Sequence, residues 1–528
     1  MRCLKSLPGL LFFCAEVMLM VTACAWIPEG DKPAEFIAPP TLTHALSDIP
    51  HNESASARQH WPKPGWWHEF GSDELNSLMT IALKNNPNLK VAAARLREAT
   101  ALVRVEGARL LPFLDADAEF SNERISENGV FAVLNRQEAA GANIVFAQIN
   151  PFNFRYEFDF WGKNRAALEA AIGEAGSEQA EWAETRLQLT SAIARSYLRG
   201  AALHQQLDLA RKIVELQHEL LILAETRLQL GLDSEDPVKQ VNIALEAANK
   251  REAGVRDQLD LQRNLLARLI GGGPDSTHHL FTDTLSISKA LQLPAKLPLE
   301  LLAHRPDLAS ALRRAEAAAQ RIKVAKARFL PTIDLTAFAG INALRLTKGA
   351  NSLANILFSG SSFSYGVAPG LRLPWFEGGR LRGELSAQRA EYDGAVELYN
   401  DTLLHAVQEV ADSLSSWKES RTILEAQERL LSSQLRNHEL AADRFRLGLD
   451  DRRLMLRRQN TVFDQEFALK SLQADHWVAR VDLIEALGGG YANDLQLVQQ
   501  KIKHPPEHPG GFSLYPWLMF WSSPANEN

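Results

Sequence analysis

The chain has 528 residues, with 57 Lys and Arg against 64 Asp and Glu and a formal net charge of −7. This mildly acidic balance excludes broad binding of nucleic acid, which needs clustered positive charge. Hydrophobic residues make up 46% of the chain, as in folded proteins, but the mean hydropathy of −0.19 excludes a bundle of membrane-spanning helices, each of which needs about 20 apolar residues. A membrane β-barrel stays open, because its strands alternate apolar and polar residues.

Residues 1–23 have the pattern of a bacterial export signal, with a basic start and two apolar runs. The segment Val21-Thr22-Ala23-Cys24 resembles a lipobox, in which a peptidase cuts before the Cys and the thiol is then acylated. The alternative is an ordinary signal peptide with an incidental Cys. We predict that Cys24 is lipidated and begins a linker over residues 24–70, since acyl chains give membrane affinity without a spanning helix. Ala25, where a retention signal would have Asp, favours the outer membrane.

The middle of the chain contains the same landmarks twice. Asn86-Pro87-Asn88-Leu89 returns as Arg305-Pro306-Asp307-Leu308, 219 residues later. A Leu-Pro segment, an Arg-Leu-Gly-Leu-Asp-like segment and a triple glycine return in the same order at nearly the same offset. This order predicts an internal two-fold repeat. We expect repeat 1 over residues 71–291, repeat 2 over residues 292–491 and a C-terminal tail over residues 492–528.

Each repeat is expected to contain a helix, a β-hairpin and two long helices. The proline-free stretch 163–230 would be about 100 Å long as one helix. Leu207, Val214, Leu221 and Leu228 are spaced seven apart, which predicts coiled-coil packing. Two shorter helices broken at a glycine remain the alternative for this stretch.

The hairpins are expected over residues 112–160 and 331–374. Aromatic residues at every second position from 152 to 160 alternate with Arg155, Glu157 and Asp159, which predicts a strand with one apolar and one charged face. In a soluble sheet the charged face would meet water, whereas in a membrane barrel it would line the lumen. We favour the lumen for all three charged residues. Four strands cannot close a barrel, which needs at least eight, so copies of the chain must share one: a trimer gives twelve strands and a dimer eight.

These segments together resemble the TolC-like outer-membrane efflux protein family, in its acylated NodT or OprM-like branch. The matching segments are Trp66–Gly71, the two repeated Pro motifs, Asp159–Lys163, Leu373–Arg380 and Ala486–Tyr491. The resemblance implies an α+β membrane protein: a homotrimer with a 12-stranded barrel, four strands per chain, that continues into an α-helical coiled-coil tunnel across the periplasm. It further implies the exit duct of a tripartite pump for drugs or other small toxic compounds, joined to a periplasmic adaptor (membrane-fusion) protein and an inner-membrane transporter.

Two short segments fall between a long helix and a returning one. They are Leu230-Gly231-Leu232, which follows Arg227, and Leu447-Gly448-Leu449, which follows Arg444. Glycine permits the left-handed backbone that a helix reversal needs. The bland interpretation is a turn alone; the resemblance implies that both tips also dock on the adaptor.

The periplasmic entrance departs from the family pattern. Where relatives often carry Asp residues six and nine positions past the second tip glycine, this chain has Leu454 and Arg457. We expect these two residues at the entrance, with Arg457 closing it through salt links. Candidate counter-charges are Asp233, Glu235, Asp236, Asp450 and Asp451.

The sequence gives no sign of catalysis. It contains no Walker loop, no Gly-x-Ser-x-Gly elbow and no Cys pair spaced for zinc, and the adjacent His278 and His279 fit a solvated loop. We therefore expect neither an enzyme nor a cofactor or metal. Two other functions stay open: an exit duct for type I-like protein secretion, and a lipid-anchored periplasmic coiled-coil protein without a pore.

Overall fold

The computed structural model describes residues 27–40, 62–128, 141–281, 304–347 and 354–491. All of them belong to the first of two units of the chain, which ends at Tyr491. The export signal, Cys24 and the tail over residues 492–528 lie outside the described residues. None of the described helices is both long and apolar enough to cross a membrane.

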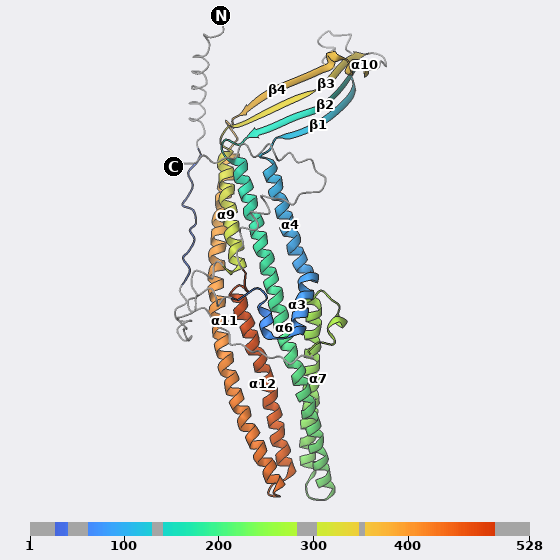
Figure 1. The fold of residues 1–528 in the computed structure, drawn as a ribbon, viewed down its shortest axis with the longest axis vertical. Coiled ribbons are helices and arrows are strands. Elements are labelled where there is room, and N and C mark those ends of the chain that lie inside the picture. Colours follow the sequence, from blue (N-terminus) through green and yellow to red (C-terminus); the bar gives the residue numbers. More distant parts are fainter. Residues whose placement is uncertain (1–26, 41–61, 129–140, 282–303, 348–353, 492–528) are drawn as a thin grey trace. The chain divides into compact units, whose positions relative to one another are not determined.

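Two series of helices follow one another in the same order (Figure 1). The first is α4 (Pro87–Ala108), α6 (Lys163–Gln229) and α7 (Glu235–Leu269), and the second is α9 (Pro306–Ala327), α11 (Arg380–Arg446) and α12 (Arg452–Ala486). Both series have lengths of 22, 67 and 35 residues. Shorter elements are η2 (Trp66–Phe70), α3 (Asp73–Asn85), η3 (Pro274–Thr277), α10 (Ala354–Leu357) and η4 (Gly360–Ser362).

The long helix expected over residues 163–230 is confirmed as one unbroken element. Its internal glycines are close-packing positions and not breaks: a Cβ at Gly173 would lie 3.0 Å from the Cβ of Ala317 on α9. Of the predicted heptad line, Leu207 is buried within one chain, and Val214, Leu221 and Leu228 are partly buried, so coiled-coil packing stays a prediction. The buried line is Ile213, Leu216, Leu220 and Ala224. Because α6 packs against α7 on one side and α12 on another, its apolar surface is broader than a two-helix seam.

Each series contributes one hairpin to a single antiparallel sheet. The strands are β1 (Phe113–Arg124), β2 (Asn143–Phe158), β3 (Thr332–Thr347) and β4 (Phe363–Arg372), in the order β1-β2-β3-β4. The two hairpins meet where β2 pairs with β3, so β1 and β4 are the edges of the sheet. The strands lie within the hairpin ranges expected from the sequence.

The register places most of the apolar residues on one face and most of the polar residues on the other, because residues directly opposite on antiparallel strands share a face. Tyr156 pairs with Leu335, which pairs with Pro369, and bulges between Asp115 and Asp117 and between Ile149 and Phe152 keep the apolar set together. The apolar face carries Leu114, Ala118, Phe120, Ala147, Ile149, Phe152, Phe154, Tyr156, Phe158, Ile333, Leu335, Ala337, Ile341, Phe363, Tyr365, Val367 and Leu371. The other face carries Asp115, Asp117, Glu119, Asn150, Asn153, Arg155, Glu157, Asp334, Thr336, Asn342 and Ser364, together with the apolar residues Phe113, Phe146, Phe338 and Leu344.

A hydrophobic core lies where α3 and η2 meet the middle of α6. Trp66, Phe70, Ile193, Tyr197 and Leu259 are almost fully buried there. The Tyr197 hydroxyl lies 2.9 Å from the Ser72 hydroxyl and donates to Glu74 at 2.7 Å, which satisfies its polar end inside the core. This core joins the N-terminal elements to both long hairpins.

The N-terminal segment 27–40 runs along α11 as a strap. The Arg389 guanidinium donates to the Pro28 carbonyl at 2.8 Å, and Asp393 and Asn400 accept from the amides of Ala34 and Ile37. The three helix residues share one side of α11, because they are spaced four and seven apart.

Candidate functional site

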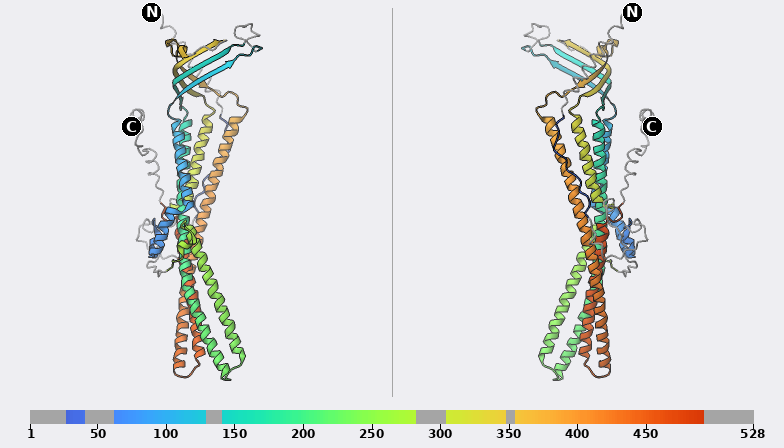
Figure 2. Two further views of the ribbon diagram at one scale, coloured as in Figure 1. Left: turned by 90° about the vertical axis from the view of Figure 1, so that its right-hand side faces the viewer. Right: turned by 90° about the vertical axis from the view of Figure 1, so that its left-hand side faces the viewer.

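The first hairpin tip joins α6 to α7, at the end of these helices opposite the sheet (Figures 1 and 2). Gly231 has φ +69°, and the amide of Leu232 donates to the Arg227 carbonyl at 2.8 Å, which closes the last turn of α6. Leu230 and Leu232 are exposed on either side of the glycine. A Cβ at Gly231 would meet nothing within 4 Å, so the backbone conformation requires the glycine and local packing does not.

The second tip joins α11 to α12 and repeats this geometry. Gly448 has φ +71°, and the amide of Leu449 donates to the Arg444 carbonyl at 2.9 Å. Leu447 and Leu449 are exposed, and a Cβ at Gly448 would also meet nothing within 4 Å. The sequence prediction of a left-handed glycine in both reversals is therefore confirmed.

Each tip is braced by the same ion pair. Arg227 Nε lies 2.6 Å from Asp233 Oδ2, and Arg444 Nε lies 2.5 Å from Asp450 Oδ2. The hydrogen bond from each arginine lowers the pKa of its aspartate below the ordinary range. Both carboxylates are therefore ionised at neutral pH, and the two arginines have structural partners within their own tips.

The two tips are linked to each other, and Arg227 Nη1 lies 3.9 Å from Asp451 Oδ2. Asp233 also accepts a hydrogen bond from Arg453 of α12 at 3.0 Å, and Arg452 pairs with Glu219 of α6. On the side of these charges that is nearer the sheet, Leu216 and Leu220 of α6 pack on Leu456 of α12. One level further, the Gln217 amide donates to Asn460 Oδ1 at 3.1 Å. A ladder of polar and apolar contacts therefore joins the two hairpins near their tips.

Leu454 and Arg457 lie in the first two turns of α12, where the sequence places the entrance. Both are exposed, and among the described residues the Arg457 guanidinium has no ion-pair partner. Within one chain none of the candidate counter-charges Asp233, Glu235, Asp236, Asp450 and Asp451 forms an ion pair with it, so closure by Arg457 stays a prediction about the assembled protein. Asp233, Asp450 and Asp451 are taken by Arg227, Arg444 and Arg453, which are nearer along the chain or on the facing helix.

The three charged residues predicted to line a lumen divide into two groups. Arg155 and Glu157 lie in β2 on the polar face of the sheet. Asp159 is not a strand residue, because β2 ends at Phe158. Its carboxylate instead accepts from the backbone amides of Asn164 and Arg165 at 2.9 Å each. Anions are stabilised at a helix N-terminus, so the strand prediction for Asp159 is corrected to a capping role for α6.

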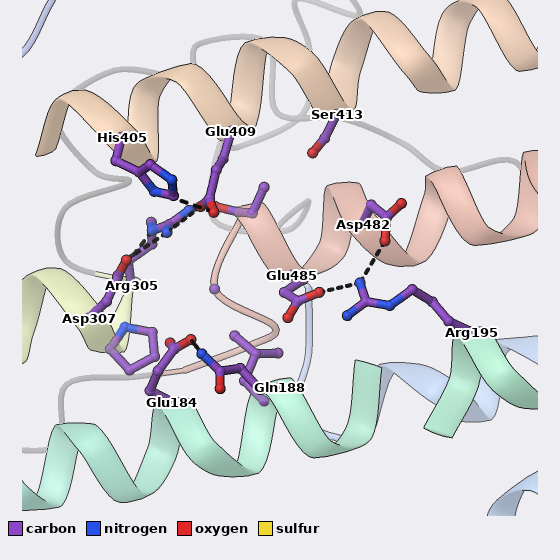
Figure 3. Close-up of a pocket in the computed structure, with 14 residues that line it drawn as sticks. Glu184, Gln188, Arg195, Arg305, Asp307, His405, Glu409, Ser413, Asp482 and Glu485 are labelled. Carbon is purple, nitrogen blue, oxygen red and sulfur yellow. Dashed lines mark hydrogen bonds and ion pairs between the residues drawn. The ribbon is translucent and has the colours of Figure 1, made fainter. Parts of the chain in front are cut away.

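A polar cavity lies where α6, α9, α11 and α12 converge, and neither the motifs nor the spacing of the sequence predicted it. It has a volume of about 410 Å³, and its lining includes Glu184, Arg195, Arg305, Asp307, His405, Glu409, Asp482 and Glu485 (Figure 3). Arg195 from α6 holds Asp482 at 2.6 Å and Glu485 at 2.5 Å on α12. The signal that could have revealed it was the Arg305-Pro306-Asp307 motif, which the sequence analysis used only as a repeat landmark.

Arg305 is the buried centre of one side of this cavity. Its guanidinium binds Asp307 at 2.6 Å and Glu409 at 2.7 Å and donates to the Ala486 carbonyl at 2.8 Å. Burial disfavours its charge, but the hydrogen bonds and charges of Asp307 and Glu409 outweigh burial and raise the pKa of Arg305. Through these partners the buried cation links three helices, α9, α11 and α12.

Glu184 faces the same cavity without an arginine of its own. Its Oε1 accepts from the Gln188 side chain at 2.7 Å. Burial, followed by the charge of Asp307, raises the pKa of Glu184 to about 7. The neighbouring Glu485 also has a raised pKa, because burial outweighs its pairing with Arg195. The cavity therefore contains a carboxyl group that titrates near neutral pH.

The described residues contain no group of His, Cys, Asp or Glu side chains that could hold a metal ion. His278 and His279 are exposed in a turn after η3.

Comparison with known proteins assigns the chain to a family. The family described as "Outer membrane efflux protein" matches residues 78–272 and 297–489, which together are most of the chain. The chain belongs to this family and is an outer-membrane efflux protein.

Individual relatives cover nearly the whole chain. The "Pyoverdine export outer membrane protein OpmQ" of Pseudomonas aeruginosa PAO1 is 30% identical over 486 residues, which are 91% of this chain and 98% of OpmQ. The "Multidrug resistance outer membrane protein MdtP" of Escherichia coli K12 is 27% identical over 484 residues, 89% of this chain and 94% of MdtP. The crystal structure of the outer membrane protein VceC of Vibrio cholerae superposes with a TM-score of 0.71 at 31% identity, covering 81% of this chain and all of VceC.

Proposed function

We propose that three copies of the chain close a 12-stranded barrel in the outer membrane, and that their helices form a tunnel through the periplasm. The observation that carries this proposal is the sheet. One of its faces exposes large apolar residues on β1, β2 and β4, among them Phe120, Phe152 and Tyr365. Its edge strands β1 and β4 are each paired on one side only among the described residues. A sheet with open edges is not stable in lipid, so closure must come from further copies.

In this assembly the apolar face contacts lipid, and Arg155 and Glu157 line the lumen. A trimer supplies twelve strands and a dimer eight, and both could close. The resemblance to the TolC-like family, which implies a homotrimer, favours three. Lipidation at Cys24 would add a second anchor to that of the barrel.

The duct receives its cargo at the hairpin tips. Two exposed leucines flank a left-handed glycine at each tip, an arrangement that leaves a small apolar surface with little side-chain bulk. We assign both tips to docking on a periplasmic adaptor, with an inner-membrane transporter supplying the energy. Leu454 and Arg457 would then lie at the entrance, one turn and two turns above the second tip.

The cargo is a small molecule. OpmQ is named for pyoverdine export and MdtP for multidrug resistance, and the chain covers nearly the full length of both. An exit duct for type I-like protein secretion is the alternative within the same fold. A lipid-anchored coiled-coil protein without a pore fits poorly with an apolar sheet face.

The test is complementation in a strain that lacks its own outer-membrane channel but retains an adaptor and a transporter. The chain should restore resistance to toxic compounds, and native mass spectrometry of the detergent-extracted protein should give a trimer. Restored secretion of a protein substrate without restored resistance would support the alternative. A monomer without conductance in planar bilayers would contradict the barrel.

A further inference from the structure

One large aromatic side chain lies on the polar face of the sheet, in a strand that has a neighbour on each side. Phe338 of β3 pairs with Asn153 of β2 and with Gly366 of β4, so its surroundings on the sheet come from its own chain. The side chain lies near the middle of β3 and is 43% exposed. In the proposed barrel this face lines the lumen, which places the ring on the path of the cargo.

The nearest positions around Phe338 on this face carry small side chains. Along β3 they are Thr336 and Gly340, two residues before and after it. On β4 they are Ala368, which pairs with Thr336, and Ser364, which pairs with Gly340. No bulky side chain of β3 or β4 therefore stands beside the ring.

The ring leans toward β4, over a glycine. A Cβ at Gly366 would lie 2.6 Å from Cε1 of Phe338 and 3.1 Å from Cζ, so the ring fills the space that a side chain at 366 would need. Asn153, opposite Phe338 on β2, leans the other way, since its side-chain amide donates to Asp117 of β1. The two side chains lean apart, and the ring lies along the sheet as a contact surface without narrowing the lumen.

Carboxylates predominate on the same face. The register places there Asp115, Asp117, Glu119, Glu123, Glu157 and Asp334, against Arg155 and Arg372. A surface of this charge attracts cations, and a cation gains further attraction over the face of an aromatic ring. The surroundings of Phe338 therefore suit a positively charged compound better than an anion.

We propose that Phe338 is the residue of the barrel lumen on which the aromatic part of an exported compound stacks during transit. This inference rests on the proposed barrel and its export of small molecules; three copies place three such rings at one level of the lumen. An aliphatic compound gains little from the ring, whereas an aromatic compound gains stacking and an aromatic cation gains both interactions. Phe338 thereby favours aromatic cargo over other cargo of the same charge.

Block of the current through the full-length channel in planar bilayers tests this. Ethidium, a planar aromatic cation, is compared with tetraethylammonium, a cation of the same charge without a ring, each added on the side of the sheet. Phe338→Leu keeps an apolar side chain but removes the ring, and Phe338→Tyr keeps the ring. Leu344→Ala, which shortens another exposed apolar side chain on the same face of β3, is the matched control.

The concentration of ethidium that halves the current should rise roughly two- to tenfold in Phe338→Leu, the range that an aromatic contact supplies, and should stay unchanged in Phe338→Tyr and Leu344→Ala. Block by tetraethylammonium should be the same in all four proteins. Equal block by ethidium in Phe338→Leu and the unsubstituted chain would overturn the inference, as would an equal change for both cations. If the unsubstituted chain forms no trimer and conducts no current, the barrel itself has failed, which distinguishes the two proposals.

Discussion

The two halves of the chain have the same backbone devices but differ in their charges. In the first half Asn86 precedes α4 and donates to the Leu269 carbonyl at 2.8 Å, at the end of α7. In the second half Arg305 precedes α9 and donates to the Ala486 carbonyl at the same distance, at the end of α12. The neutral residue needs no further partners, whereas the charged one gathers Asp307 and Glu409 around it.

This difference indicates that the two halves share the requirements of their backbone and can differ in the contacts of their charged side chains. Glycines fix the equivalent turns: a Cβ at Gly271 would lie 2.9 Å from the Asn85 carbonyl oxygen, and one at Gly488 would collide with that of His304. Backbone requirements of this kind are common to both halves. Charged partners are shared at the tips, where Arg227–Asp233 and Arg444–Asp450 are equivalent pairs, but the cavity and the link between the hairpins each involve the halves unequally. Changes to the shared backbone should act equally in both halves, and changes to charge should not.

The largest effect is expected on the sheet, where both halves contribute equally. Tyr156→Arg and Tyr365→Arg each place a charge on the apolar face and should cost about 2–4 kcal/mol per protomer near the middle of the membrane. The trimer recovered from membranes should fall sharply for both variants, measured by unheated gel electrophoresis. Ser364→Arg, one residue away on the polar face, is the matched control for Tyr365→Arg and should insert normally. Equal tolerance at 364 and 365 would contradict the assignment of the faces.

The next effect is expected at the tips, again in both halves. Gly231→Trp and Gly448→Trp add bulk where the adaptor is proposed to dock and force a side chain into a left-handed backbone. Efflux should be lost while the amount of trimer stays unchanged, measured by drug susceptibility beside membrane quantification. Gly448→Asn is the control, because Asn tolerates this backbone and is small. Full efflux by both Trp variants would leave the glycines with a turn role alone.

An unequal effect is expected from the link between the hairpins. Arg453→Gln removes the contact to Asp233 and should raise the resting conductance in planar bilayers, more at low salt, where exposed ion pairs are least screened. Arg444→Gln, which loses only the pair within the second tip, should change conductance less. Arg457→Glu should also have a smaller effect than Arg453→Gln unless a neighbouring protomer supplies a partner. If Arg457→Glu has the larger effect, closure depends on contacts between copies.

The sequence predicted those features that depend on a local pattern. The absence of proline after Gly162 predicted α6, and alternating residues predicted the faces of β2. The prediction that Asp159 is a strand residue was wrong by one position, because the alternation of apolar and charged residues continues past Phe158, where the backbone pairing of β2 stops. The partners of Arg453 and the cavity were missed for a different reason. Ion pairs depend on which helices become neighbours, and the Arg195–Asp482 pair joins residues 287 positions apart.

The last effect is expected from the titration of Glu184, whose pKa is raised first by burial and then by the charge of Asp307 in the second half. With its pKa near 7 in the folded chain and 4.5 in a model peptide, Glu184 keeps its proton in the folded state over a range in which the unfolded chain has lost it. The folded state then binds more protons, so its stability should fall as the pH rises from about 4.5 to 7. Above pH 7 the full cost of the buried charge, up to roughly 3 kcal/mol, is present, and below pH 4.5 it is absent.

Glu184→Gln removes this titration while keeping a side chain that can bond to Gln188. The variant should have a flatter dependence of melting temperature on pH between 5 and 7.5 and should be the more stable protein at pH 8. Glu215→Gln, which changes an exposed carboxylate on the same helix, is the control and should follow the unsubstituted protein. The charge of Asp307 raises the pKa of Glu184, and that of Arg305 lowers it. Asp307→Asn should therefore lower the pKa of Glu184 and end the fall in stability at a lower pH. An unchanged pH profile for Glu184→Gln would show that the cavity is hydrated enough to hold the charge, and the two halves would then differ in structure without differing in their response to pH.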